Sequence, residues 1–201
     1  MIRVARIAPS GARSMGFQSL LFGFEGRINR EKCWLGGLFV NFSAVILAMA
    51  VLTAARLCGS GAISLGFDVS DLLRLVDPTA IRSAITNLHK ADAVSATTWL
   101  PVVFRVLVTP VVAWCLAAII VKRLHDRDRS GWWIIPFVVA PGLFGHFSDR
   151  LGDSTAMSFL DFGFSCLGAW GAIELLFRRG TQQTNRFGPN PLAAGNVDQP
   201  A

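Results

Sequence analysis

The chain has 201 residues, of which 52% are hydrophobic and only 16% are charged, and its formal net charge is +6. A soluble domain has about 25% charged residues. Too little polar surface remains in this chain to cover a soluble core of the size that its apolar residues would form. The composition therefore excludes an ordinary soluble domain and indicates an integral membrane protein, with no nucleic acid among its expected partners.

Residues 1–16 form a basic N-terminal extension that holds Arg3, Arg6 and Arg13. No apolar region follows these arginines at the spacing of a signal peptide. The first long apolar run begins at Cys33, and we expect it to act as an uncleaved membrane anchor.

Four apolar stretches follow, at about 33–56, 99–121, 131–148 and 154–177. A bilayer core of ~30 Å needs about 20 helical residues, so each stretch is long enough, or nearly long enough, to cross. We predict an all-α integral membrane bundle of four helices over residues 17–191. The third stretch contains Pro136 and Pro141, which predict a kink.

The segments outside the four stretches are expected to be a long outer loop at 57–98 and a disordered tail at 192–201. Within the loop, Asp77 and Pro78 are typical of a helix start. Ile81, Ile85 and Leu88 follow at helical spacing. Two interpretations stay open: a short amphipathic helix on the outer leaflet, and a partly ordered loop.

The distribution of basic residues predicts the orientation, because Lys and Arg concentrate on the cytoplasmic side of bacterial membrane proteins. Residues 1–32, 122–130 and 178–201 together hold 13 basic side chains. The opposite side, 56–98 and 149–153, holds five basic side chains, balanced by six aspartates. We therefore expect a multi-pass protein of the bacterial plasma (inner) membrane with both termini in the cytoplasm.

Residues that could bind metals or form disulfides are scattered. No two of the four cysteines are spaced as a CxxC pair, and we interpret them as small packing residues: Cys33, Cys58, Cys115 and Cys166. The histidines show no spacing typical of a metal site. No metal, cofactor or catalytic residue is predicted.

Two charges in the apolar stretches occupy matching positions. Arg105 lies 17 residues before Lys122, and Asp161 lies 17 residues before Arg178. At ~1.5 Å per residue both charges would lie at the same depth. This predicts an intramembrane Arg105–Asp161 pair, with the second and fourth spans side by side. Alternatively, each side chain reaches the outer interface separately. Glu174 is expected to pair with Arg178, one helical turn away.

Three polar motifs flank the apolar stretches: FEGRINREKCW (24–34), RLHDRDRSGWW (123–133) and NRFGPNP (185–191). Within them, Asn29 and Ser130 are expected to cap the helices that follow, and Gly26 permits a turn. Together the motifs resemble the YhaH-like bacterial inner-membrane family, a domain of unknown function (domain 805). The resemblance covers residues 17–191 and implies a small helical membrane bundle, but no activity. Members of the family usually have an aromatic residue where Cys33 stands.

The topology places these motifs on one face of the membrane, and four helices of ~10 Å diameter would hold them close together. We therefore predict one polar cap on the cytoplasmic side. In it, Asp126 or Asp128 should bind an arginine of the first or last motif, and His125 should form a hydrogen bond. The alternative is three independent solvated loops. The predicted cap residues are Arg27, Arg30, Arg123, His125, Asp126, Asp128, Arg129, Ser130, Asn185 and Arg186.

The surplus positive charge of the cap suits a phosphate headgroup or another anion. The favoured function is a binding or scaffold module that recognises an anionic lipid headgroup or a partner, such as a second copy or another membrane protein. Two alternatives stay open: a component of a small-solute transporter, and a membrane enzyme that uses His125 and Asp126. An enzyme is less favoured, because no nucleophile motif accompanies this pair.

Overall fold

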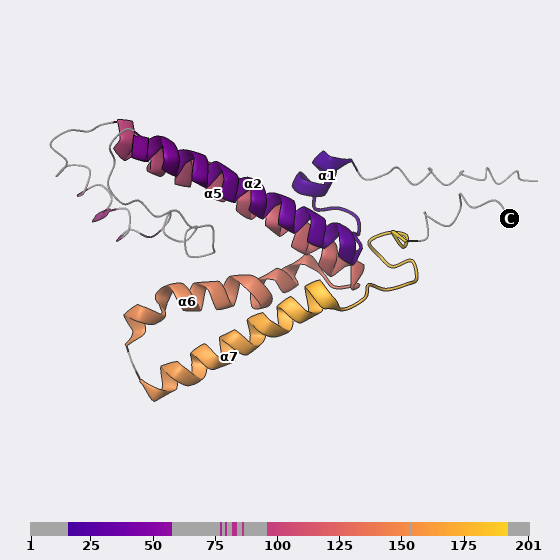
Figure 1. The fold of residues 1–201 in the computed structure, drawn as a ribbon. Helices are drawn as coiled ribbons and strands as arrows, with labels where there is room; N and C mark the ends of the chain where they lie inside the picture. Colours follow the sequence, from indigo (N-terminus) through magenta and orange to yellow (C-terminus); the bar gives the residue numbers. More distant parts are fainter. Residues whose placement is uncertain are drawn as a thin grey trace, which may run out of the picture.

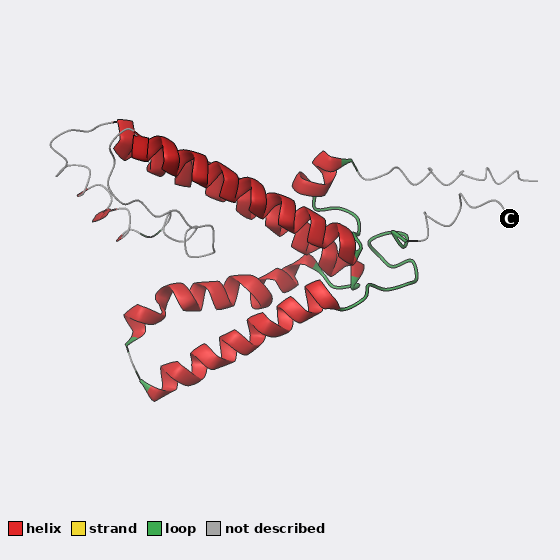
Figure 2. Cartoon of the chain, in the orientation of Figure 1, coloured by secondary structure: helices red, strands yellow, loops and turns green. Residues whose placement is uncertain are grey.

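The structure is a computed structural model that describes residues 16–57, 77, 79, 82, 83, 86, 96–152 and 154–192. These residues are helical apart from the connecting segments, and they contain no strand beyond one isolated bridge between Asn185 and Gly188 (Figure 2). The α-helices are α1 (Phe17–Phe22), α2 (Arg30–Leu57), α5 (Ala96–Asp126), α6 (Ala140–Leu151) and α7 (Thr155–Ala172). A 3₁₀ turn, η1 (Gly131–Trp133), and two π-helices, η2 (Ile135–Val139) and η3 (Ile173–Phe177), complete the fold.

Among the described residues, three helical stretches are long and apolar enough to cross a membrane: Arg30–Leu57, Val106–Asp126 and Thr155–Phe177. They correspond to the first, second and fourth predicted spans. The third predicted span, 131–148, is helical but divided among η1, η2 and α6. Pro136 and Pro141 explain the division, because a proline nitrogen cannot donate to the preceding turn. At these prolines the helix changes to a π-helix, and the predicted kink stays a prediction.

The helices form two pairs that lie close together at one end and diverge toward the other (Figure 1). In one pair α2 packs along α5, and in the other α6 packs along α7. The contacts of α5 with the fourth apolar stretch are concentrated at η3. The predicted side-by-side packing of the second and fourth spans therefore applies only near the converging end. The Arg105 side chain lies outside the described residues, so the Arg105–Asp161 pair stays a prediction.

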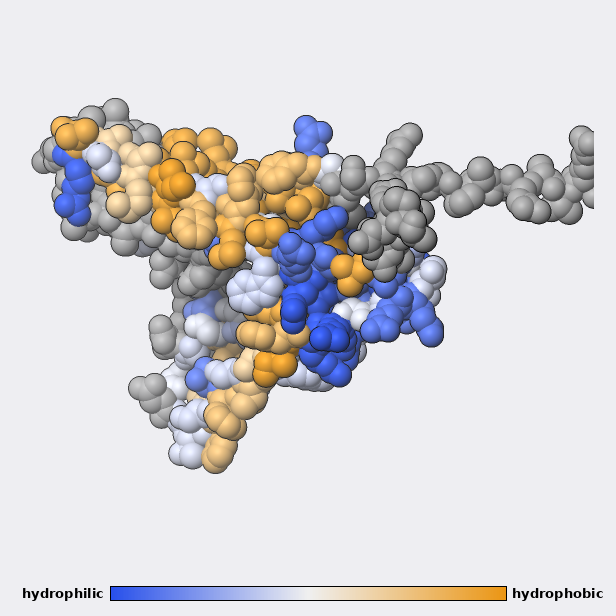
Figure 3. Space-filling model, turned by 45° about the vertical axis from the view of Figure 1, so that its right-hand side comes forward, coloured by the Kyte–Doolittle hydropathy of each residue, from blue (hydrophilic) through white to orange (hydrophobic). Residues whose placement is uncertain are grey.

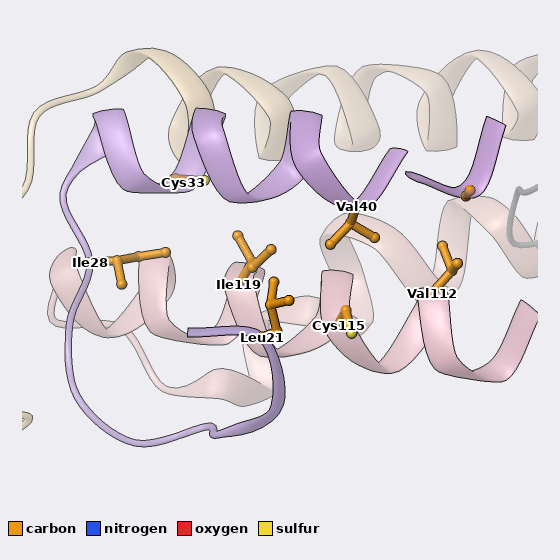
Figure 4. Close-up of a cluster of buried hydrophobic side chains, with 8 residues drawn as sticks. Leu21, Ile28, Cys33, Val40, Val112, Cys115 and Ile119 are labelled. Carbon is orange, nitrogen blue, oxygen red and sulfur yellow. The ribbon is translucent and has the colours of Figure 1, made fainter. Parts of the chain in front are cut away.

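Small residues allow the close packing of α2 on α5. Gly36, Val40, Ala44 and Ala48 repeat every four residues and are buried, so they form one stripe along α2. A Cβ atom on Gly36 would lie 3.1 Å from Cδ1 of Ile119 on α5. Val40 and Ala44 of this stripe belong to a buried cluster that also contains Leu21, Ile28, Cys33, Val112, Cys115 and Ile119 (Figure 4).

The second pair makes its closest contact where its two π-helices lie. Phe137 of η2 packs on Gly171 of α7, where a Cβ atom would lie 2.6 Å from the Phe137 Cβ. Phe137 also joins Leu124 and Leu175 in a second buried cluster. Further along, large side chains of α7 such as Phe159 and Phe162 are exposed. The outer faces of both pairs are apolar, as the crossing of a bilayer requires.

The short helix α1 is held against α5 by a buried lysine. Lys122 is fully buried, and its Nζ donates to the carbonyl of Ser19 at 2.6 Å and also to that of Leu20. These carbonyls belong to the last turn of α1, where a positive charge is favoured. This interaction explains how a lysine is tolerated in the interior of the protein.

Two smaller expectations have mixed outcomes. Cys33 and Cys115 are buried packing residues, as predicted, whereas Cys166 is exposed; all three are free thiols, and Cys58 lies outside the described residues. In the segment predicted to be an outer loop, the Asp77 carboxylate accepts from the amide of Thr79 at 2.9 Å, as an N-cap does. Thr79, Arg82, Ser83 and Thr86 are helical. Ile81, Ile85 and Leu88 lie outside the described residues, so the amphipathic face stays a prediction.

Candidate functional site

Three segments distant in the sequence meet at the converging end of the helix pairs. They are the turn 23–29 before α2, the end of α5 with the loop 127–130, and the segment 178–192 after η3. We call this assembly the polar cap. Figure 3 shows hydrophilic residues gathered there, between arms covered by apolar residues. Gly26 has a φ of 85°, a conformation that glycine adopts without strain. The turn that follows it places Arg27 inside the cap.

Arg27 is the central donor of the polar cap. Its Nε and Nη2 atoms donate to Oδ1 of Asp126, at 3.3 and 3.1 Å. Its Nη1 atom donates to the carbonyls of Gln183 at 3.0 Å and Gly188 at 3.1 Å. Nη2 also donates to the carbonyl of Thr181 at 2.6 Å. The Arg27 side chain is only 1% exposed, so this one side chain ties the last segment to α5.

Asp126 is the matching acceptor. Its Oδ1 atom binds Arg27, and its Oδ2 atom binds Arg123, one turn earlier on α5. Arg123 is fully buried and also donates to the carbonyls of Leu175, at 2.8 Å, and Arg178. Both oxygens of the carboxylate are therefore occupied by guanidinium groups. A Cβ atom on Gly180 would overlap the same carboxylate, so the chain passes Asp126 at a glycine.

The segment after η3 is fixed by short polar contacts on the other side of α5. Thr181 donates its amide to the Asp126 carbonyl at 2.9 Å. Asn185 Nδ2 donates to the His125 carbonyl at 2.9 Å and to Thr181 Oγ1 at 3.2 Å. The His125 ring stacks on Phe187 with ring centroids 3.8 Å apart, and its Nδ1 atom lies 3.3 Å from the Gly26 carbonyl oxygen. These contacts hold His125 in a structural position.

A second buried carboxylate, Glu174 of η3, lies within ion-pair distance of three arginines. Arg127 contacts it at 2.9 Å, Arg129 at 3.3 Å and Arg178 at 2.7 Å. The predicted contact with Arg178 is confirmed. Arg129 also lies over the Trp133 ring, with its Cζ atom 4.5 Å from the centroid. This cluster carries two more positive charges than negative ones.

The remaining residues predicted for the polar cap lie at its edge. Arg186 pairs with Asp128 at 3.3 Å, and both side chains are at least half exposed. Ser130 accepts from the amide of Trp132 at 3.5 Å and caps η1 as predicted. Asn29 accepts from the amide of Lys32 at 2.8 Å and so caps α2, also as predicted.

An open pocket of about 330 Å³ lies at the N-terminus of α2, between that helix and the segment 179–192. Its wall contains Arg30, Glu31 and Arg179, together with Arg123 and Asp126, which neutralise each other. Arg30 and Arg179 are exposed, and neither forms an ion pair with another described residue. Among the first-turn amides of α2, that of Lys32 is already capped by Asn29. The amides of Arg30 and Glu31 have no intrahelical acceptors and add partial positive charge. The pocket therefore combines free cations with a helix N-terminus, which suits an anion.

The structure brings nine of the ten predicted cap residues into contacts with other parts of the cap or with η1. The tenth, Arg30, lies in the pocket wall. Asp161 is exposed on α7, and its pairing with Arg105 stays a prediction. Several residues were not among the predicted cap residues: Lys122, Arg127, Arg179, Gly180, Thr181 and Phe187. Glu174 was predicted to pair with Arg178, but not with Arg127 and Arg129. The basic residues and the motif around Phe187 gave a signal in the sequence, whereas Gly180 and Thr181 gave none.

The geometry limits the chemistry that the cap can perform. A general base needs a free lone pair near a reacting proton, whereas both oxygens of Asp126 accept from arginines. His125 is stacked and bonded to the backbone. Within the described residues, no three His, Cys, Asp or Glu side chains are grouped to hold a metal ion. The arrangement is suited to binding an anion rather than to acid–base catalysis.

Comparison with known proteins places the chain in a family without assigning an activity. No curated protein and no solved structure matches it. A family model described as "Protein of unknown function (DUF805)" matches residues 21–189. This range includes α2, α5, α6 and α7 and almost the whole polar cap, and the chain therefore belongs to the DUF805 family.

Proposed function

We propose that this protein is a binding module of the bacterial inner membrane that recognises a phosphate group at its polar cap. In this proposal the apolar segments cross the bilayer four times, with the broken helix η1–α6 as the third crossing. Both termini and the polar cap lie in the cytoplasm. The strong positive bias of the segments at the cap supports this orientation.

The observation that carries the proposal is the pair of unneutralised arginines in the pocket at the N-terminus of α2. Arg30 and Arg179 come from opposite walls of a space of about 330 Å³. Guanidinium groups bind phosphate oxygens through paired N–H donors. Glu31 also lies in the wall, and its carboxylate opposes an anion, so Arg30, Arg179 and Glu31 together leave one net positive charge.

Binding of phosphate-bearing ligands to the purified full chain in mild detergent tests the proposal. Long-chain phosphatidic acid and inorganic phosphate are titrated separately, with diacylglycerol as the ligand that lacks phosphate. Arg30→Gln combined with Arg179→Gln should weaken binding of phosphatidic acid about tenfold or more, since one charge-assisted hydrogen bond contributes ~1.5 kcal/mol or more. The control is Arg56→Gln, which removes an exposed arginine from the other end of α2.

The two ligands separate the two sources of phosphate. Saturable binding of inorganic phosphate with the affinity of the lipid would identify a soluble phosphate ligand, whereas a clear preference for phosphatidic acid would identify a lipid headgroup. Equal binding of phosphatidic acid and diacylglycerol, or full binding by the double variant, would contradict the proposal.

A further inference from the structure

A larger hollow lies between the two helix pairs, on the apolar side of the polar cap. Its volume is about 640 Å³, and every helix pair contributes to its wall. The wall includes Cys33 of α2, Ile120 of α5, Phe137 of η2, Gly145 of α6, Gly168 of α7 and Leu176 of η3. The wall also contains His146, whose Nε2 atom lies 3.4 Å from the Asp77 carboxylate. The rest of the wall is apolar or lacks a side chain, so the cavity offers an included molecule few hydrogen-bond partners. An apolar cavity of this kind stays dry or takes up an apolar guest.

The cavity and the cap pocket are lined by neighbouring parts of α2 and of the chain from η3 onward, and α2 contacts η3. Cys33 and Leu176 line the cavity, whereas Arg30 and Arg179, each three residues away in the sequence, line the cap pocket. Trp34 lies at this contact, where its Nε1 atom donates to the Leu176 carbonyl at 3.2 Å. From the cap pocket to the cavity, the protein therefore presents basic groups, then a tryptophan, then apolar space. A phospholipid presents its phosphate, interfacial region and acyl chain in the same order.

The length of the cavity favours a lipid chain over a membrane-spanning helix of a second protein, which would extend across the whole ~30 Å core. The wall extends along the fourth apolar stretch from Gly168 to Leu176, eight helical steps or ~12 Å. That length stays within one leaflet, about half of the ~30 Å core.

We propose that this cavity holds one acyl chain of the lipid whose phosphate group binds in the cap pocket. This inference rests on the proposed function and adds to it that the ligand is a membrane lipid. The chain segment nearest the headgroup lies between the helix pairs, and the rest of the chain continues into the bilayer.

Photo-crosslinking tests the inference with the full chain in vesicles that contain phosphatidic acid carrying a diazirine in one acyl chain. Label is expected on peptides that contain Phe137, Val138 and Leu176. Gly145→Leu fills the cavity from α6, where nothing lies within 4 Å of an added Cβ atom. Gly168→Leu fills it from α7, against Pro141 at 3.7 Å. Each variant should reduce this label about tenfold, which corresponds to ~1.4 kcal/mol.

The matched control is Gly163→Leu, on the same helix as Gly168. An added Cβ atom at Gly163 also meets nothing within 4 Å, and Gly163 is not part of the cavity wall. The amount of lipid crosslinked to the cavity peptides of this variant should equal that of the wild type. Label that falls on the exposed face of α2, or that persists in both cavity variants, would overturn the inference.

Inorganic phosphate separates failure of this inference from failure of the proposed function. The cavity variants should retain phosphate binding, whereas Arg30→Gln with Arg179→Gln should lose it. If phosphate binding depends on the two arginines but the cavity variants are crosslinked as strongly as the wild type, the acyl-chain inference alone is wrong. If phosphate binding is independent of the arginines, the proposed function is wrong.

Discussion

Arg27 and Arg123 lie buried inside the polar cap, whereas Arg30 and Arg179 lie exposed at its pocket, although all four are the same residue type. The buried pair shares the two oxygens of Asp126 and donates to backbone carbonyls of the segment 175–188. The exposed pair has no such acceptors among the described residues. The comparison indicates that the buried arginines hold the fold and the exposed arginines are available to a ligand. Substitutions should separate these two roles.

The largest effect on stability is expected for Asp126→Ala. Removing this carboxylate leaves two buried guanidinium groups without their counterion, and breaking a buried ion pair in this way costs about 3–5 kcal/mol. Thermal unfolding in detergent, followed by the loss of the folded size-exclusion peak, would measure the change. Asp128→Ala is the matched control, because the Asp128–Arg186 pair is at least half exposed. Equal losses in the two variants would show that burial of the ion pair is irrelevant.

A smaller loss, about 2 kcal/mol, is expected for Arg27→Lys. A lysine keeps the charge but cannot reach Asp126, Gln183, Gly188 and Thr181 at once, so some of these hydrogen bonds, each worth about 0.5–1.5 kcal/mol, are lost. Limited proteolysis at Arg186 should become faster because the segment 181–188 is released from α5. Unchanged cleavage relative to wild type would contradict the role of Arg27 as the tie between them.

Glu174→Gln should destabilise by about 1–3 kcal/mol, because a buried acceptor for three arginines becomes neutral. The change should be partly relieved when Arg127→Gln is added, since fewer like charges then face one another. A double-mutant cycle on unfolding midpoints would give the coupling, expected at about 0.5–3 kcal/mol. Strict additivity of the two substitutions would show that the Glu174 cluster does not act as a unit.

Part of this organisation could be predicted from the sequence. Helix lengths and basic loops were sufficient to predict that three distant motifs share one end, and local rules predicted the caps at Asn29 and Ser130. The choice of Arg27 rather than Arg30 as the buried arginine depends on the turn at Gly26, which the sequence permits but does not specify. The carbonyl acceptors at Thr181, Gln183 and Gly188 carry no side-chain signal.

The division of the third apolar stretch and the cavity could be predicted less well. Two prolines predicted a kink, but not the π-helix that places Phe137 on Gly171. Glycines have two different roles: at Gly36 and Gly171 an added Cβ atom would crowd Ile119 and Phe137, whereas Gly145 and Gly168 have room for a Cβ atom beside the cavity. Nothing in the local sequence distinguishes these roles, because they depend on what the facing helix presents.

The smallest effect on stability is expected for Arg30→Gln combined with Arg179→Gln, within about 0.5 kcal/mol, as for surface substitutions in general. One measurement therefore tests the central claim: the unfolding midpoint with and without phosphatidic acid. A ligand that binds only the folded state stabilises it by ~2.7 kcal/mol at 100 times its Kd. We predict that the double variant keeps the lipid-free midpoint of the wild type and loses the lipid-induced shift. A lowered lipid-free midpoint, or a shift of wild-type size, would contradict the division between structural and ligand-binding arginines.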